Sequence, residues 1–168
     1  MKHFGTILFK EEQRKRFRSG ELVKEWAKMY KEIFDEDDIR ITLKQSKTNS
    51  YHFFEWLAAV VIYSCTGYLS LVEKYQFESH PRKQKILSKL FSNEIIAKIR
   101  TGNSQGPDLL CYTPDFKNCF FCEAKGLRDK ISSVQRKRFH NLERATGKEI
   151  YLIEFKEIGP DNRLERRA

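Results

Sequence analysis

The feature that most constrains the fold is a pair of short apolar runs, DLLCY (108–112) and CFFCEAK (119–125). Runs of this length are typical of strands, whose side chains alternate between two faces of a sheet. The segment between them contains Pro114 and Asp115, residue types that favour turns. The sequence therefore predicts two neighbouring strands joined by a turn.

The segments around this hairpin alternate between helical and strand-like patterns. Helices are predicted at 21–34, 49–67, 80–100 and 130–146, and strands at 38–44 and 149–158. Residues 68–77 fit either a strand or a continuing helix, and 95–100 fit either the end of a helix or a strand. In the helix at 49–67, Ser50 is the expected cap and Gly67 the expected end. The order predicts an α/β fold with a mixed central sheet flanked by helices.

The length of 168 residues favours one main domain. Its core is assigned to 49–158. Residues 1–48 form an N-terminal extension, with a helix and a short strand that can pack on the core. Residues 159–168 form a polar tail.

The charge balance favours a polyanionic partner. The chain has 32 Lys and Arg against 23 Asp and Glu, a formal net charge of +9. Nucleic acid is the first candidate partner, and an anionic membrane is the second. No apolar run reaches the roughly 20 residues that a membrane span needs, so a membrane partner is not expected. The N-terminus carries no signal peptide pattern, which favours a cytoplasmic protein with reduced cysteines, associated with the nucleoid if the source is prokaryotic.

Three charged residues interrupt the apolar hairpin. Glu123 and Lys125 lie two apart and so share one face of their strand, while Asp108 begins the preceding strand and can approach Glu123. Clustered carboxylates repel each other unless a cation holds them, and Mg²⁺ or Mn²⁺ suits such hard oxygen ligands. A lysine beside a bound metal can contact a phosphate or orient a water. The set therefore suggests hydrolysis of a phosphodiester.

The same residues carry a family resemblance. Pro107-Asp108 followed by Glu123-Ala124-Lys125 resembles the PD-(D/E)xK nuclease signature. The longer run EAKGLRDKISSVQ resembles the VRR-NUC branch of that superfamily, in which E-x-K-G is followed by D-x-x-S-x-x-Q. In this chain the later positions are Asp129, Ser132 and Gln135. The resemblance covers about residues 106–156, extends to the helix at 49–66 as a further candidate, and implies a restriction-endonuclease-like core.

The resemblance implies roles for the metal ligands. Asp108 and Glu123 would bind Mg²⁺ or Mn²⁺ together with the backbone carbonyl of Ala124. The superfamily commonly adds an acidic residue from a helix that precedes the sheet. Glu55 is the best match, because it is the only Asp, Glu, Lys or Arg between Ser50 and Thr66.

The resemblance also implies roles around the ligands. Lys125 would position or activate the attacking water, and Gln135 would support the arrangement of the lysine and the metal-bound water. Basic residues near this region are expected to meet the phosphate backbone, which gives a salt-dependent affinity without sequence preference. These are Arg128, Lys130, Arg136, Lys137 and Arg138.

The predicted function is a divalent-metal-dependent DNA endonuclease, structure-specific in repair or recombination, or acting on foreign DNA. The alternative is a non-catalytic nucleic-acid-binding module on a nuclease fold, and RNA stays open as the substrate. A homodimer is compatible with a small nuclease that cuts two strands.

Some of the residues near the hairpin also have simpler structural explanations. Asp129 fits a helix N-cap. Cys119 and Cys122 fit either a zinc site or buried thiols, and thiols are favoured because the two residues face opposite sides of a strand.

Overall fold

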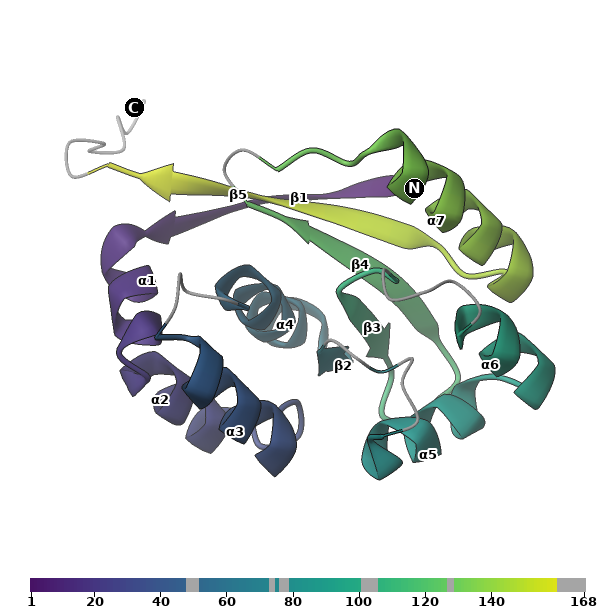
Figure 1. Ribbon diagram of the computed structural model, residues 1–168, viewed down its shortest axis with the longest axis horizontal. Helices are drawn as coiled ribbons and strands as arrows, with labels where there is room; N and C mark the ends of the chain where they lie inside the picture. Colours follow the sequence, from purple (N-terminus) through teal and green to yellow (C-terminus); the bar gives the residue numbers. More distant parts are fainter. Residues whose placement is uncertain (48–51, 73–74, 76–78, 101–105, 127–128, 160–168) are drawn as a thin grey trace.

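The computed structural model describes residues 1–47, 52–72, 75, 79–100, 106–126 and 129–159. Seven helices and five strands are found in these ranges (Figure 1). The elements run in the order β1 (Lys2–Lys10), α1 (Glu11–Arg18), α2 (Glu21–Met29), α3 (Glu36–Gln45), α4 (Phe53–Thr66), β2 (Leu69–Val72), α5 (Pro81–Leu90), α6 (Asn93–Arg100), β3 (Leu109–Tyr112), β4 (Cys119–Lys125), α7 (Ser133–Thr146) and β5 (Ile150–Ile158).

The strands form one five-stranded sheet in the order β1-β5-β4-β3-β2. Both β1 and β4 run parallel to β5, whereas β3 runs antiparallel to β4 and to β2. The predicted α/β fold with a mixed sheet is therefore confirmed. The parallel pair β4–β5 is joined through α7, as parallel strands require a crossover connection.

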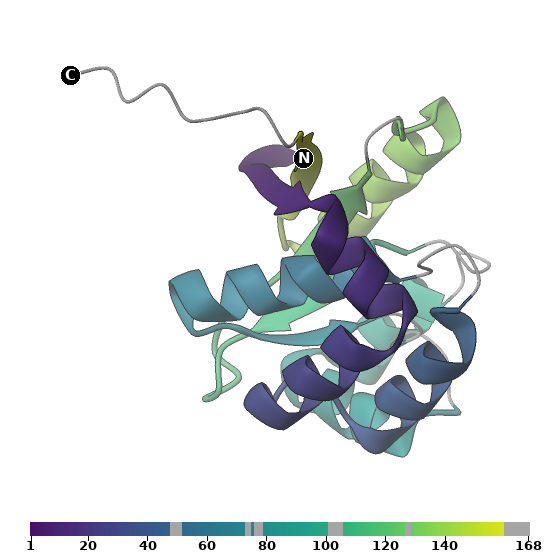
Figure 2. The ribbon, with the colours of Figure 1, turned by 90° about the vertical axis from the view of Figure 1, so that its left-hand side faces the viewer.

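Helices cover both faces of the sheet, and β3 shows how. Its residues Leu109 and Cys111 belong to one hydrophobic core with residues of α1, α2 and α4. Leu110 and Tyr112 point the other way, into a second core with residues of α5, α6 and α7. Because successive side chains of a strand point to opposite faces, each face of the sheet packs against its own layer of helices. Helices α1 to α3, from the first layer, lie nearest the viewer in Figure 2.

The hairpin that most constrained the sequence is formed as predicted. Leu109 lies opposite Cys122, and Tyr112 lies opposite Cys119. Continuing this register by one residue sets Asp108 opposite Glu123. The two carboxylates thus reach the same end of the sheet because antiparallel strands bring the start of one strand to the end of the other.

The strand predicted at 38–44 is wrong, because these residues belong to α3. Asp35 caps this helix, and its side chain accepts a hydrogen bond from the backbone N–H of Asp38 at 2.8 Å. The acidic residues of the first turn also favour a helix N-terminus. Ile39 and Leu43, which pack against the first core, are four residues apart. That spacing suits a helix face as well as a strand face, so alternation alone misled the prediction.

Several ambiguous segments are settled by the structure. Residues 68–77 contain β2, which pairs with β3, while 95–100 belong to α6. Helix α4 follows His52 as its cap residue and ends at Gly67, whose φ of 74° lies in the left-handed region that glycine adopts readily. The expected cap Ser50 lies outside the described residues.

The N-terminal segment contains an edge strand that the sequence patterns did not indicate. Strand β1 pairs along β5 from Lys2 to Lys10, and α1 follows it directly. Phe9 and Phe17, from these two elements, are buried in the first core. Residues 2–18 are therefore built into the sheet and its first helical layer.

Of the tail assigned to 159–168, only Gly159 is among the described residues. Within the described ranges, the structure contains no helix with the length and apolar character needed to cross a bilayer.

Candidate active site

Asp108, Glu123 and Lys125 meet at the end of the β3–β4 hairpin. The Oδ2 of Asp108 accepts a hydrogen bond from the backbone N–H of Ala124 at 2.8 Å. The Nζ of Lys125 lies 2.6 Å from the Oε1 of Glu123, whose side chain is only 3% exposed. Glu123 and Lys125 share a face of β4, as strand alternation requires. The hairpin register therefore gathers two carboxylates and one ammonium group.

Glu55 approaches the same cluster from α4, which belongs to the first helical layer. It lies in the first turn of α4, and its side chain is 22% exposed. Burial raises the pKa of Glu55 to about 7, with further repulsion from Glu123 and attraction from Lys125. Its Oε1 also lies 3.9 Å from the Nδ1 of His52. The structure thus brings Glu55 within electrostatic range of Glu123 and Lys125.

The cluster places three carboxyl groups, each at least partly buried, around a single ammonium group. Burial raises the pKa of Asp108 well above its usual range, and repulsion from Glu123 and Glu55 adds to this effect. Burial likewise raises the pKa of Glu123 despite its hydrogen bond with Lys125. Burial works against the charged form of Lys125, but the interaction with Glu123 outweighs it and raises the lysine pKa. Lys125 is therefore a cation, and the carboxyl groups around it favour a further positive charge.

Gln135 is held in place by the N-terminus of α7. Its backbone N–H donates to the Oγ of Ser132 at 3.1 Å, and its side-chain Oε1 accepts from the backbone N–H of Ser132 at 3.1 Å. This reciprocal capping box fixes the amide, because the carbonyl oxygen is already committed. The Nε2 can then donate to the Oε1 of Glu123 at 3.3 Å. The S-x-x-Q part of the motif thus both starts a helix and contacts the site.

Asp129 does not cap α7, contrary to the prediction, because Ser132 is the cap residue. Asp129 instead closes a turn after β4. Its Oδ2 accepts from the backbone N–H of Gly126 at 3.2 Å, and its own N–H donates to the carbonyl of Gly126 at 3.2 Å. The N-cap signal was misassigned by three residues, since both Asp and Ser are good caps.

Gly126 allows the chain to leave β4 beside α4. A Cβ at this position would lie 2.6 Å from Cε2 of Phe54 and 3.0 Å from Oδ2 of Asp129. Real Cβ atoms do not approach other atoms so closely, so only glycine fits without a shift of the ring. Phe54 directly precedes Glu55, and the contact therefore helps to set the first turn of α4 against the end of β4.

Tyr75 is a neighbour of the site that the sequence did not reveal. Its hydroxyl donates to the carbonyl of Pro107 at 2.8 Å. Burial raises the pKa of this phenol well above its usual range, and the charges of Asp108 and Glu123 add to the effect. The residue falls in the segment 68–77 that had no clear pattern, so no sequence signal marked it.

The donor set suits Mg²⁺ or Mn²⁺ in its chemistry, since it offers carboxylate oxygens with raised pKa values and a backbone carbonyl at Ala124. As placed, however, no group of three His, Cys, Asp or Glu side chains among the described residues is arranged to hold a metal ion. Lys125 already contacts Oε1 of Glu123.

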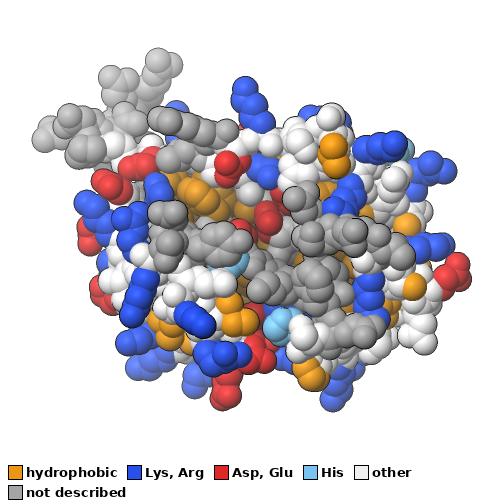
Figure 3. All heavy atoms as spheres, viewed as in Figure 1, with side chains coloured by type: hydrophobic (Ala, Val, Ile, Leu, Met, Phe, Trp, Pro, Cys, Tyr) orange, Lys and Arg blue, Asp and Glu red, His pale blue; other side chains and the backbone are white. Residues whose placement is uncertain are grey.

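Of the basic residues predicted to meet nucleic acid, Lys130 precedes α7, and Arg136, Lys137 and Arg138 lie within it. Lys130, Arg136 and Lys137 are exposed, Arg138 is half-buried, and Arg128 lies outside the described residues. Figure 3 shows Lys and Arg side chains around much of the rim of one face, interspersed with Asp and Glu. The net positive charge is thus spread widely over the face shown.

The cysteines of the C-x-x-C face opposite sides of β4, as predicted. Cys122 is buried in the first core, and Cys119 packs against the second. Both are free thiols, as is Cys111. Burial raises the pKa of Cys111 to about 12, which favours the neutral thiol. These residues act as small apolar side chains within the two cores.

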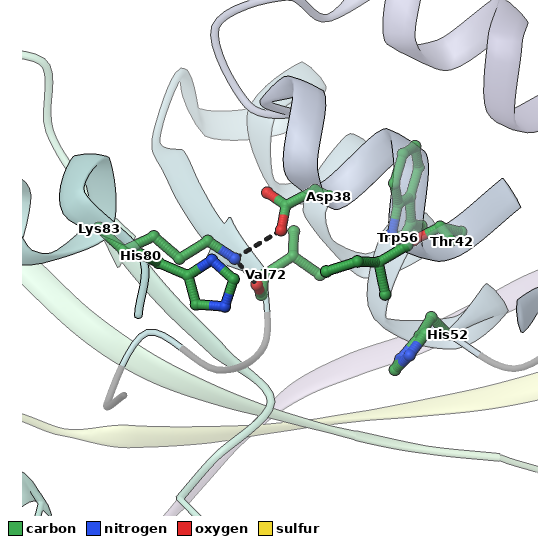
Figure 4. Close-up of a pocket in the computed structure, with 8 residues that line it drawn as sticks. Asp38, Thr42, His52, Trp56, Val72, His80 and Lys83 are labelled. Carbon is green, nitrogen blue, oxygen red and sulfur yellow. Dashed lines mark hydrogen bonds and ion pairs between the residues drawn. The ribbon is translucent and has the colours of Figure 1, made fainter. Parts of the chain in front are cut away.

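A second polar cluster lies in a small cavity between α3, α4 and α5 (Figure 4). The Nζ of Lys83 contacts Oδ1 of Asp38 at 2.5 Å and donates to the carbonyl of Val72 at 2.7 Å. Lys83 is almost fully buried, and the cavity volume is about 20 Å³, enough for one water. The cluster is therefore a structural link between α3, β2 and α5.

In comparisons with known proteins, no family model matches the chain, and no curated protein matches it significantly. The functional argument therefore depends on the residues and geometry of the site.

Proposed function

We propose that this protein is a divalent-metal-dependent DNA endonuclease that hydrolyses phosphodiester bonds, similar to VRR-NUC nucleases on a PD-(D/E)xK core. The observation that carries the proposal is the convergence of Asp108, Glu123 and Lys125 at one end of the sheet. Burial raises the pKa values of both carboxyl groups, and repulsion from Glu123 adds to the effect at Asp108. Perturbed groups of this kind cluster at functional sites more than elsewhere.

The residues have complementary parts in the proposed reaction. A Mg²⁺ or Mn²⁺ ion held by Asp108, Glu123 and the carbonyl of Ala124 would polarise the phosphoryl oxygen and make a bound water more acidic. Lys125 is charged and half-buried, so it can orient the attacking water or contact the phosphate. Glu55 would join the ligand set directly or through a water.

Gln135 is a positioning residue in this proposal. Its amide is fixed by Ser132 and donates to Glu123, which restricts the rotation of the Glu123 carboxylate. A ligand that is already oriented loses less freedom when it binds a metal. Exposed Lys130, Arg136 and Lys137 would meet the phosphate backbone and provide a salt-dependent affinity.

The chain charge of +9 supports a nucleic acid as the substrate. DNA is proposed by the resemblance to VRR-NUC nucleases, while RNA is a second substrate to test. Two copies acting together would let one site per chain cut both strands of a duplex. The proposed context is repair, recombination or defence against foreign DNA.

The test is cleavage of duplex, flap and four-way-junction DNA, and of RNA, with Mg²⁺ or Mn²⁺. Asp108→Asn and Lys125→Met should each abolish cleavage at a temperature where thermal unfolding shows that the variant is still folded. Lys117→Met is the matched control, because Lys117 is an exposed lysine in the turn of the same hairpin. Full activity in both site variants would overturn the assignment.

The alternative of a non-catalytic binding module predicts a different response to metal. A nuclease with these ligands should gain thermal stability from millimolar Mn²⁺ or Mg²⁺, because a ligand that binds the folded state stabilises it. Asp108→Asn should remove that gain. A wild-type protein that binds DNA, cleaves none of these substrates and shows no metal-dependent shift would instead be the binding module.

A further inference from the structure

A groove between α6 and α7 begins beside the carboxylate cluster. Its volume is about 350 Å³, and Gly106 and Pro107 are among its lining residues. Pro107 immediately precedes Asp108 and accepts the hydrogen bond of Tyr75, so this part of the groove adjoins the proposed catalytic site. The groove therefore lies where a part of the substrate next to the scissile phosphate could be held.

One face of α7 continues from the site into the groove. Gln135, which contacts Glu123, is followed on the same helical face by Arg138 and Leu142, three and seven residues later. Ala145 extends this face by three more residues and also lines the groove. A strand of substrate that passed Gln135 would follow this face of the helix.

The lining of the groove combines an apolar floor with two cations. Ile99 and Leu142 belong to or pack against the second core and present apolar surface. Arg138 and Lys98 supply the positive charge, and the described lining residues include no Asp or Glu. Lys98 pairs with Glu94 at 3.2 Å on the exposed surface of α6, a type of pair that contributes at most about 1 kcal/mol and that a phosphate can replace.

The volume of the groove limits the size of the ligand that it can bind. A volume of about 350 Å³ lies at the lower end of the range for small-ligand pockets, roughly 300 to 1,000 Å³. It suits one nucleotide and excludes a stacked duplex. Apolar surface below a base and cations beside its phosphates are the chemistry of single-strand binding.

We propose that this groove binds one unstacked nucleotide of an unpaired strand, beside the phosphate that is cut. The base lies on Ile99 and Leu142, and Arg138 with Lys98 contacts the flanking phosphates. The assignment rests on the proposed nuclease function for its orientation toward the site. It narrows the substrate to a nucleic acid with an unpaired segment at the cleavage point.

The test is fluorescence anisotropy with labelled oligodeoxyuridylate, oligouridylate and a blunt DNA duplex of equal length, in EDTA and at fixed salt. Arg138→Ala removes one cation, and Ala145→Phe fills the groove without a change of charge. Each should weaken the binding of at least one of the two single strands about tenfold and change duplex binding little. The strand affected identifies the sugar of the occupant.

Arg144→Ala is the matched control, because Arg144 is an exposed arginine of the same helix that is not among the described lining residues, and its loss should affect strand and duplex equally. The proposal is overturned if neither groove variant weakens single-strand binding, or if both variants weaken duplex binding as much as they weaken single-strand binding. Binding in EDTA needs no cleavage, so failure of the nuclease assignment shows only in the Asp108 and Lys125 cleavage assays. The thermal unfolding of each variant confirms that it is folded.

Discussion

Replacing Glu55 by Gln should stabilise the metal-free protein at neutral and alkaline pH. The folded structure raises the pKa of Glu55 to about 7, mainly by burial, against an ordinary value of 4.5. The folded state therefore holds the proton more tightly than the unfolded state does. As the pH rises from about 4.5 to 7, the unfolded state releases that proton first, and the free energy of unfolding falls. A neutral amide of the same shape avoids this loss.

The size of the effect follows from the shift. The rise of the Glu55 pKa from 4.5 to about 7 corresponds to a loss in the free energy of unfolding of at most roughly 3 kcal/mol at pH 8, at about 1.36 kcal/mol per pKa unit. The side chain is 22% exposed, and the water at that surface screens part of the charge. A gain of about 1 to 3 kcal/mol is therefore expected at pH 8, and close to none at pH 4.5, where Glu55 is protonated in the folded state and half-protonated in the unfolded state.

The assay is urea denaturation of wild type and Glu55→Gln, with a chelator, at several pH values. Glu149→Gln is the control, since Glu149 is an exposed carboxylate whose pKa is lowered by its hydrogen bond with Lys2. That variant should show no gain at pH 8. In Mn²⁺ the difference in the free energy of unfolding between Glu55→Gln and wild type should become smaller or change sign, because the wild type binds the ion better. If Glu55→Gln destabilises the chelated protein at pH 8, or if its effect is independent of pH, Glu55 does not belong to the charge cluster.

Three further variants test other parts of the structure. Gly126→Ala should cost about 1 to 3 kcal/mol by overpacking against Phe54, and urea denaturation should show a smaller cost in a Phe54→Leu background; equal costs would refute the contact. Lys83→Met should cost about 3 to 5 kcal/mol at pH 8 by leaving Asp38 buried without its cation. Because burial raises the pKa of Asp38 to about 6, this loss should shrink in thermal unfolding at pH 5, and a loss independent of pH would contradict it. Gln135→Leu should lower the affinity for Mn²⁺ about tenfold by calorimetry, and an unchanged affinity would exclude a positioning role.

The hairpin and its charges could be predicted because their information is local. Strand alternation sets Glu123 and Lys125 on one face, and the short turn forces Asp108 to the same end of the sheet. The capping box of Ser132 and Gln135 was also present in the sequence as S-x-x-Q. The family pattern points to the same two residues, and the cap alone explains why the Gln135 amide is fixed.

Other parts depend on contacts between distant segments. Strand β1 pairs with β5, at the other end of the chain. Its burial alternates from Thr6 to Lys10, but the exposed apolar Leu8 hides this alternation in the sequence. Tyr75 gains its place from the carbonyl of Pro107, thirty-two residues later. The α3 segment was misread because Ile39 and Leu43 satisfy both periods, and only the Asp35 cap distinguishes them.

The candidate site lies between the two helical layers, and this position explains how the fold keeps its buried carboxyl groups together. Glu55 comes from the first helical layer, Gln135 comes from the second, and Glu123 lies on the strand between them. Buried carboxyl groups that repel one another would separate if either layer could move away from β4. The two hydrophobic cores oppose that motion because each one anchors a helix that reaches the cluster. A loss of packing in either layer should therefore loosen the charge cluster, even where the substituted residue does not touch it.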